Sequence, residues 1–394
     1  MDPTPTPTTT ATEPPERGAG GPGGGREVLV VFHEPVVGGA TLSVLRTLPH
    51  LAERGWRFLI WAPRPSPLFD HLQEQGWEAH GAERTVSYSL AALRLPPGPR
   101  ARLRAMPAYL GALRRLARER RPALAHVNSL VTLADGALLR SAGIPVVAHL
   151  HEMIAPTLKG NLARAGIRAV SAEAIGVSGA CAAQLAIGGW HPHVVDEGAI
   201  YPPEPTARMR TEGEPPVVAS VGVISRRKGS DVFVEAAEIV RAERPEVRFR
   251  LVGSATDPLD AEWAQGVLER AGAAGVEHLA RADVPALLAE IDVFALPSRI
   301  DPCPISLLEA MGAGLPVVGA ASDGIPEQLA GGAAGELVPR EDPAALAAAI
   351  LRLLDDPDRA RRLGTAARER ALDHYSIERQ AAGIERVWLQ ALAG

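Results

Sequence analysis

Two carboxylates, Asp301 and Glu309, flank the start of a helix expected near Ile305, in the stretch SRIDPCPISLLEAMGAGLPVV. The amides of a first helical turn have no partner inside the helix, and with the helix dipole they can bind an anion. Here those amides belong to Ile305, Ser306 and Leu307. A carboxylate repels phosphate but accepts hydrogen bonds from hydroxyl groups. The stretch therefore predicts a sugar-nucleotide site, although an Asp301 that caps a turn and a solvated Glu309 would fit the spacing as well.

A second charged group lies in VGVISRRKGSD, residues 221–231, before the first helix expected in the second half of the chain. Lys228 stands directly before a glycine at this helix start, so its ammonium group and the helix amides could bind phosphate together. Arg226 and Arg227 could reach the same phosphates. The alternative is a basic turn on the surface.

In the first half of the chain, Gly38 and Gly39 follow the first expected strand. Two glycines let the backbone approach a ligand closely at a helix start, or they make a tight turn between strand and helix. The spacing is not GxGxxG, so it does not predict a dinucleotide site.

Histidines stand at the end of another strand, in HLHEM. Alternation along a strand places His149 and His151 on one side, where a histidine could contact a sugar or move a proton, or could be structural. Glu152 could orient this histidine or contact an acceptor. His33 and Glu34, after the first strand, have a similar arrangement.

The elements that would position these residues alternate between strand and helix, which predicts an α/β fold with parallel sheets. The pattern stops at YPPEPTARMRTEGEPP and then restarts, so we expect two tandem Rossmann-like domains that face a central cleft. The expected parts are a disordered tail (1–25), a first domain (26–200), a linker (201–216), a second domain (217–375) and a last helix (376–394) that could pack back on the first domain. The strands are expected at 26–32, 57–63, 123–129, 145–151 and 174–178, and then at 217–224, 248–253, 276–280, 293–298, 316–320 and 335–338.

Composition excludes several classes of protein. The net charge of −5 and the 4% of aromatic residues do not favour nucleic acid as a partner. Cys181 and Cys303 make neither a disulfide framework nor a zinc pattern, which suits a cytoplasmic protein. The one clear D-x-D, at 356–358, is expected to end a helix, and no metal site is predicted. There is no apolar run long enough to span a membrane and no signal-peptide pattern at the N-terminus.

Arginines are concentrated between Arg94 and Arg121, where Leu110, Leu113 and Leu116 share one helical face. A basic amphipathic helix can rest on an anionic membrane, so peripheral contact with the inner face of a membrane is one expectation. A solvated, arginine-rich helix is the other.

The stretch DPCPISLLEAMGAGLPVVGAASDGIPE resembles the sugar-donor signature of the retaining GT-B glycosyltransferases of family 4. The resemblance implies that Glu309 binds the ribose, Asp301 the hydroxyls of the transferred sugar, and Lys228 the diphosphate. It also implies that Gly38 and Gly39 lie over the phosphates of the sugar donor, and that His151 lies near the sugar. Asp301 stands where the family usually has glutamate, and Val223 where it has arginine.

The function that this resemblance implies is transfer of a sugar, with retention, from a UDP- or GDP-linked donor to a hydroxyl of a glycan, lipid-linked or small-molecule acceptor. It implies no cofactor, and no nucleophile stands out. Assistance by the leaving phosphate is therefore expected, with orientation and charge stabilisation as the contribution of the site. The alternatives are a sugar-nucleotide epimerase, a phosphorylase, or a subunit that binds sugar nucleotides without turnover.

Overall fold

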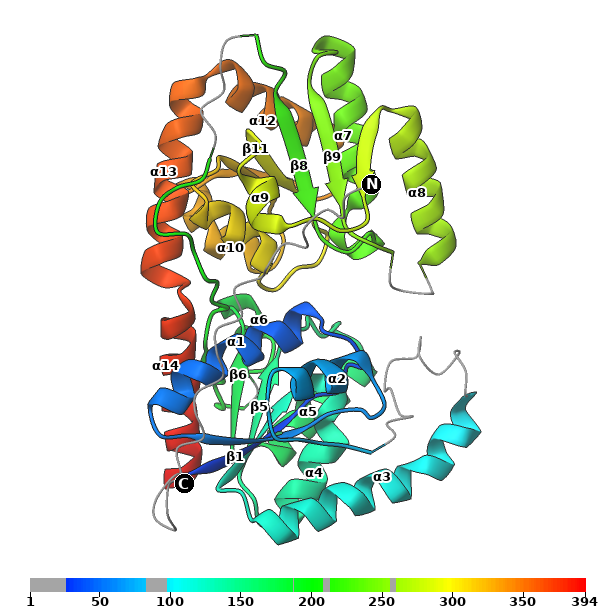
Figure 1. Ribbon diagram of the computed structural model, residues 1–394, viewed down its shortest axis with the longest axis vertical. Coiled ribbons are helices and arrows are strands. Elements are labelled where there is room, and N and C mark those ends of the chain that lie inside the picture. The colour runs from blue at the N-terminus through cyan, green and yellow to red at the C-terminus, as the bar shows by residue number, and fades with distance from the viewer. Residues whose placement is uncertain (1–25, 83–97, 187, 208–212, 256–259) are drawn as a thin grey trace, which may run out of the picture.

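The structure is a computed structural model that describes residues 26–82, 98–186, 188–207, 213–255 and 260–394. It has two α/β domains, one after the other along the chain (Figure 1). The predicted fold class is confirmed. The tail predicted at 1–25, part of the linker and Arg94 lie outside the described residues.

The first domain is built on a parallel sheet of seven strands in the order β3-β2-β1-β4-β5-β6-β7. The strands are β1 (Glu27–Val31), β2 (Arg57–Trp61), β3 (Ala79–His80), β4 (Leu124–Asn128), β5 (Val146–Leu150), β6 (Glu173–Gly176) and β7 (His193–Val194). The helices are α1 (Gly39–Glu53), α2 (Pro67–Glu74), α3 (Gly98–Arg120), α4 (Leu133–Ser141), α5 (Leu158–Val170) and α6 (Gly179–Ala183). Helices α1 and α2 pack on one face of the sheet, and α3, α4 and α5 pack on the other.

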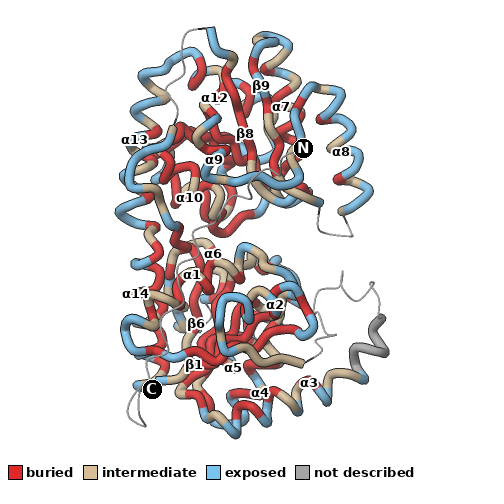
Figure 2. The backbone as a smooth tube through the Cα atoms, in the orientation of Figure 1, coloured by how far each residue is buried: buried red, intermediate tan, exposed pale blue. Residues whose placement is uncertain are grey.

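The second domain has a parallel sheet of six strands in the order β10-β9-β8-β11-β12-β13. The strands are β8 (Val217–Val221), β9 (Arg248–Val252), β10 (Val276–Leu279), β11 (Val293–Leu296), β12 (Val317–Ala320) and β13 (Glu336–Val338). The helices are α7 (Ser230–Glu243), α8 (Ala261–Ala273), α9 (Val284–Leu288), α10 (Ile305–Gly312), α11 (Ile325–Gln328), α12 (Pro343–Asp355) and α13 (Pro357–His374). Strands and inward helix faces form the buried core of each domain (Figure 2).

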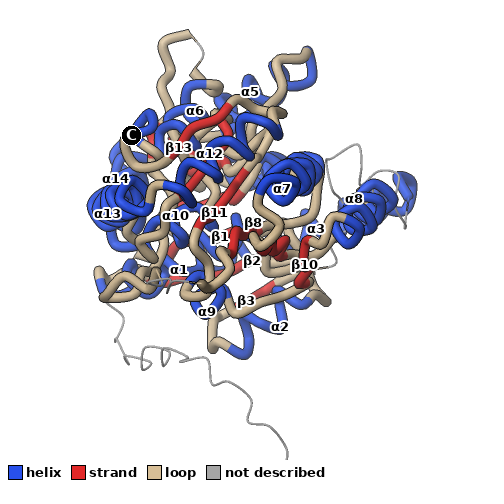
Figure 3. The backbone as a smooth tube through the Cα atoms, turned by 90° about the horizontal axis from the view of Figure 1, so that it is seen from above, coloured by secondary structure: helices blue, strands red, loops and turns tan. Residues whose placement is uncertain are grey.

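The last helix, α14 (Ile377–Ala393), continues almost end to end from α13 but leaves the second domain. Figures 1 and 3 show the two helices along one edge of the molecule, with α14 beside the first domain. Ile384 and Trp388 of α14 are fully buried in the core between α1 and the first sheet. The chain therefore crosses between the domains twice, once in the linker and once between α13 and α14.

The arginine-rich segment forms α3, and its apolar face is used by the protein itself. Leu113 and Leu116 are buried in the core of the first domain, and Leu110 packs against the same core. The expectation that this leucine face could lie on a membrane is therefore wrong. Several arginines remain exposed, namely Arg104, Arg114, Arg115, Arg118 and Arg121. Within the described ranges, no helix combines the length and the apolar character needed to span a bilayer.

Candidate functional site

The carboxyl ends of the two sheets meet at a junction between the domains, and direct hydrogen bonds cross it. Glu327, in α11 of the second domain, accepts hydrogen bonds from the amides of Gly179 and Ala180 at the start of α6, both at 2.8 Å. Arg46 of α1 donates to Glu309 of α10 at 3.5 Å. We refer to the residues of each domain that face this junction as the first-domain side and the second-domain side.

On the second-domain side, α10 starts at the predicted residue. Its first residue is Ile305, and no side chain caps the helix. The amides of Ile305, Ser306 and Leu307 therefore have no side-chain cap within the described residues. Such a turn can bind an anion, as the sequence predicted.

Asp301, just before this helix, is buried and ion-paired. Its Oδ2 atom lies 2.6 Å from the Lys228 ammonium and accepts a hydrogen bond from Ser298 at 3.1 Å. Its Oδ1 atom lies 3.5 Å from the Arg227 guanidinium. Two residues predicted for different parts of one ligand, Lys228 and Asp301, are thus paired with each other. A ligand that binds here must share these charges or separate them.

The two arginines that precede Lys228 have different partners. Arg227 stays beside Asp301, although its guanidinium also donates to the Ile300 carbonyl at 3.1 Å. Arg226 turns away, with its Nε atom 3.6 Å from Asp260 and its guanidinium 5.0 Å from the ring centre of Trp263. The structure therefore does not bring Arg226 into the site. Its exposed neighbourhood offers a carboxylate and an aromatic ring as competing partners.

Glu309 is neither solvated nor paired within its own domain. Only 23% of its side chain is exposed, and Arg46 of the first domain is its partner. Burial raises the pKa of this carboxyl, and the Arg46 guanidinium partly opposes that rise. A half-buried carboxylate with one long contact has room for further hydrogen-bond donors, such as the hydroxyls of a ribose.

On the first-domain side, both ring nitrogens of His151 are engaged. Nδ1 lies 2.7 Å from Glu197, and Nε2 lies 2.7 Å from Oδ1 of Asn128. The Asn128 amide nitrogen donates to the Ala40 carbonyl, so its oxygen is the atom that faces His151. Both imidazole nitrogens must then donate, which describes an imidazolium. In this arrangement neither nitrogen can take a proton from an acceptor, so a general-base role for His151 is not supported.

The charge of His151 is stabilised by Glu197, which sequence reasoning missed. Burial alone would lower the pKa of His151, but the Glu197 carboxylate, with Glu152 and Glu34 farther away, raises it above the usual value. Glu197 is buried and also accepts from Ser43 of α1 and from the Gln380 amide of α14, the latter at 2.9 Å. Gln380 accepts in turn from the Gly198 amide at 2.9 Å. Helix α14 therefore holds the carboxylate that holds His151.

The two glycines after β1 have different roles. A Cβ atom at Gly38 would collide with the Glu34 carboxylate, whereas nothing lies close to Gly39. Glu34 accepts from Thr41 at 3.0 Å, and its pKa is raised by burial despite that bond. Gly38 is thus the glycine that lets the loop lie against Glu34, a carboxyl available to an acceptor.

The remaining candidates of the first-domain side hold the backbone. Glu152 accepts from the Ser129 hydroxyl and from the His151 amide, the latter at 3.1 Å, so it braces the loop after β5. His33 lies 3.3 Å from the Asn128 carbonyl.

His149 belongs to the core. Its Nδ1 lies 3.2 Å from His126, which accepts from the Trp388 indole, and its Nε2 has no hydrogen-bond partner among the described residues.

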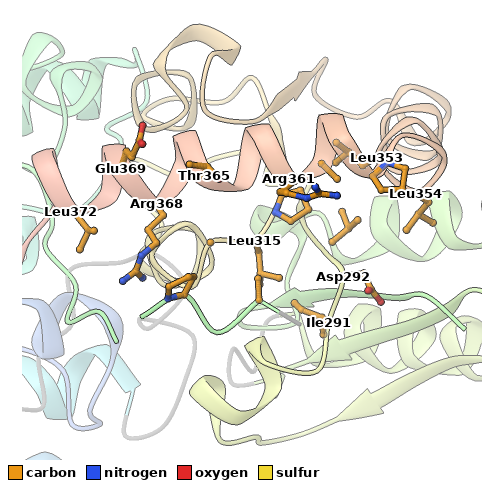
Figure 4. Close-up of a pocket in the computed structure, with 17 residues that line it drawn as sticks. Ile291, Asp292, Leu315, Leu353, Leu354, Arg361, Thr365, Arg368, Glu369 and Leu372 are labelled. Atoms are coloured by element: carbon orange, nitrogen blue, oxygen red, sulfur yellow. The ribbon is translucent and has the colours of Figure 1, made fainter. Parts of the chain in front are cut away.

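Two other features lie apart from the junction. A cavity of about 500 Å³ is lined by Leu315, Leu353 and residues of α13, at the amino ends of β11 and β12 (Figure 4). The cavity thus lies at the opposite ends of the strands from the candidate site, which is at their carboxyl ends. Asp356 of the D-x-D caps α13 by accepting from the Arg359 amide at 2.9 Å. No cluster of three or more potential metal-ligating side chains occurs in the described residues.

Comparison with known proteins identifies the family of this chain. Residues 37–197 match the model of the family described as Glycosyltransferase Family 4, and residues 215–356 match that of Glycosyl transferases group 1. A GDP-mannose-dependent alpha-(1-6)-phosphatidylinositol monomannoside mannosyltransferase of Mycolicibacterium smegmatis is 32% identical over 49% of this chain and 54% of its own length. A D-inositol 3-phosphate glycosyltransferase of Segniliparus rotundus is 35% identical over 52% of this chain and 47% of its own. The chain spans about half the length of these curated relatives.

Solved structures share the fold over nearly the whole chain. Anabaena HepE in complex with UDP and glucose has a TM-score of 0.75 and 19% identity, over 92% of this chain and 98% of its own. Sucrose-phosphate synthase from Thermosynechococcus elongatus has a TM-score of 0.72 and 22% identity, over 93% and 99%. With both domains matched by family models and the two-domain fold shared, the chain belongs to the family 4 glycosyltransferases of the GT-B fold.

Proposed function

We propose that this protein transfers a sugar from a nucleoside-diphosphate sugar to an acceptor hydroxyl, in the synthesis of a glycan or glycolipid. The observation that carries the proposal is the second-domain side of the junction. There, an uncapped helix start lies beside Lys228, Asp301 and Glu309. Amides and an ammonium suit a diphosphate, and carboxylates suit hydroxyls. The names of the relatives, which include GDP-mannose-dependent transfer, support the same class of reaction.

We further propose that the reaction retains the anomeric configuration of the sugar. This part of the proposal is inferred from the family alone. Asp301 is held by Lys228 and Ser298, which suits a sugar-binding carboxylate better than a free nucleophile. We therefore favour displacement on one face of the sugar, assisted by the leaving phosphate. Lys228 and the amides of α10 would stabilise the charge that develops on the diphosphate. Analysis of the anomeric configuration of the product by NMR tests this step, and an inverted product would contradict it.

The acceptor is proposed to bind on the first-domain side, near Glu34. Exposed arginines of α3 could hold the protein at an anionic membrane if the acceptor is lipid-linked. Co-sedimentation with vesicles that contain anionic lipid tests this contact. A variant with Arg114, Arg115 and Arg118 changed to serine should sediment less, and equal sedimentation would exclude the contact through α3.

The first experiment is a thermal-shift panel with UDP, GDP, ADP and CDP, each with and without EDTA. A ligand at 100 times its dissociation constant adds about 2.7 kcal/mol to the stability of the folded state. We expect UDP or GDP to raise the melting temperature by several degrees, with no loss in EDTA. The absence of a shift with every nucleotide would contradict the proposal, and loss of the shift in EDTA would contradict binding without a metal.

A further inference from the structure

The two carboxylates of the second-domain side have partners in different domains. Asp301 pairs with Lys228 of its own domain at 2.6 Å, whereas Glu309 pairs across the junction with Arg46 at 3.5 Å. About 30% of the Arg46 side chain and 23% of the Glu309 side chain is exposed, so the pair lies where a ligand can reach it. Glu309 is the only partner that the described residues give to Arg46. This guanidinium is therefore free to move if Glu309 takes another partner.

The other cations of this region are already committed. Lys228 and Arg227 both lie against Asp301, and Arg226 is turned toward Asp260. Arg299 donates to Asp231 at 2.7 Å and to Glu341 at 2.7 Å. A diphosphate that enters here brings two negatively charged groups, and the second domain has no uncommitted cation beside Asp301 among these residues. Arg46, on the other side of the junction, can supply additional positive charge.

We propose that Arg46 is a residue of the first domain that binds the sugar nucleotide. The hydroxyls of the ribose would replace Arg46 at Glu309, and the Arg46 guanidinium would then bind the diphosphate. The proposal rests on the proposed function, because it requires a nucleoside diphosphate at this junction. The ribose is joined to the first phosphate through its 5′ carbon and one oxygen. A guanidinium displaced from Glu309 by the ribose hydroxyls is therefore still within reach of that phosphate.

The change of partner at Arg46 couples the binding of the ribose to the binding of the diphosphate. Ribose hydroxyls alone would remove Arg46 from Glu309 and leave a guanidinium without an anion, which opposes binding. When the diphosphate is attached, Arg46 gains a charge-assisted hydrogen bond to it, and a guanidinium suits phosphate geometry. Arg46 would therefore make the protein select nucleoside diphosphates over nucleosides. It would also draw the first domain onto the bound sugar donor.

The test measures the binding of a nucleoside and of its diphosphate separately. Calorimetric titration of the full chain with uridine and UDP, or with guanosine and GDP, gives the ratio of the two affinities. The base is the one that the thermal-shift panel selects. In Arg46→Met we expect the diphosphate to bind about tenfold more weakly, while the nucleoside binds equally well or more tightly. Arg46→Lys, which keeps the charge, should recover part of the loss.

Arg54→Met is the matched control. Arg54 follows the last residue of the same helix and pairs with Glu385 at 2.7 Å, away from the junction. Its affinity ratio should equal that of the wild type. The proposal is overturned if Arg46→Met keeps the wild-type ratio within a factor of two, or if it weakens nucleoside and diphosphate equally. If the wild type binds no diphosphate at all, the proposed function fails together with this inference.

Discussion

His151 on the first-domain side and Asp301 on the second-domain side are both buried and both ion-paired, but their surroundings differ. Both ring nitrogens of His151 are held, and its partner Glu197 is itself held by Ser43 and Gln380. Asp301 has Lys228 close by and Arg227 farther away, and nearly half of the Arg227 side chain is exposed. A ligand could exchange with the partners of Asp301, whereas it would have to break a buried network to reach those of His151.

This difference assigns different tasks to the two domains. Around His151, the first-domain side is built in advance, and the charges there are satisfied by the protein itself. The second-domain side holds cations and carboxylates that can change partners when a sugar nucleotide binds. Preorganisation suits the positioning of an acceptor, and exchange of partners suits capture and release of a charged substrate.

The largest effect should come from removing the scaffold of the first-domain side. Trp388 of α14 is fully buried, packs against Trp56 and donates to His126 at 3.0 Å. Trp388→Ala should lower the free energy of unfolding by about 4 kcal/mol, because it leaves a large cavity and removes the hydrogen-bond donor of one His126 nitrogen. Chemical denaturation measures this, with Leu389→Ala, a change at an exposed neighbour on α14, as the control. A loss in Trp388→Ala no larger than that in Leu389→Ala would contradict the stabilising role of the buried Trp388.

The second largest effect should come from a change on the second-domain side. Lys228→Ala leaves Asp301 as a buried carboxylate without its closest cation and removes a phosphate partner. We expect the affinity for UDP or GDP to fall about a hundredfold, which corresponds to about 3 kcal/mol. Lys159→Ala is the matched control, because Lys159 lies exposed on α5. A change of less than threefold in Lys228→Ala would contradict the role of Lys228.

The two sides also differ in how far the sequence could predict them. On the second-domain side the informative residues lie within two short segments, 221–231 and 298–318. Local spacing predicted the start of α10, and the resemblance to the family assigned Lys228 and Asp301 to one ligand. The strands were equally predictable, because their buried apolar runs are local signals. The two-residue strands β3 and β7 were missed, since so short a pairing leaves no periodic pattern.

On the first-domain side, residues far apart in the chain meet. Glu197, Asn128 and Gln380 come from the segment after β7, from β4 and from α14, and no local pattern joins them to His151. Arg46 was missed for the same reason, because its partner Glu309 is in the other domain. The one signal available was chemical: buried polar side chains are mostly hydrogen-bonded, so a histidine at the end of a buried strand predicts polar partners from elsewhere in the chain.

A smaller effect should follow from neutralising Glu197. The pKa of His151 is raised, so its pair with Glu197 contributes fully below about pH 6.5 and loses its contribution as the pH rises through the pKa of the folded protein. Without the carboxylate, burial favours the neutral ring. Glu197→Gln should therefore cost about 2 kcal/mol in acid and progressively less in alkali. Melting temperatures from pH 5.5 to 9 measure this difference from the wild type.

Glu385→Gln serves as the control for that series, because its partner Arg54 keeps its charge over the whole range. Its deficit should not depend on pH. A deficit of Glu197→Gln that is equally flat would contradict titration of His151 within this pH range.

The smallest effect tests how the two sides are held together. Glu327 accepts from the Gly179 and Ala180 amides at 2.8 Å each, and in Glu327→Gln the side-chain amide group would face one of these donors. Loss of about 1 kcal/mol from this contact should shift the balance toward separated domains about fivefold. Small-angle scattering should then give a larger radius of gyration for the ligand-free variant than for the wild type or for Glu378→Gln, a change at an exposed site on α14. Addition of UDP or GDP should reduce the difference, because a nucleoside diphosphate bound between Glu309 and Arg46 adds contacts across the same junction. If the radius does not change without ligand, the junction is held by the covalent crossings and the packing of α14, and exchange at Glu309 must occur without separation of the domains.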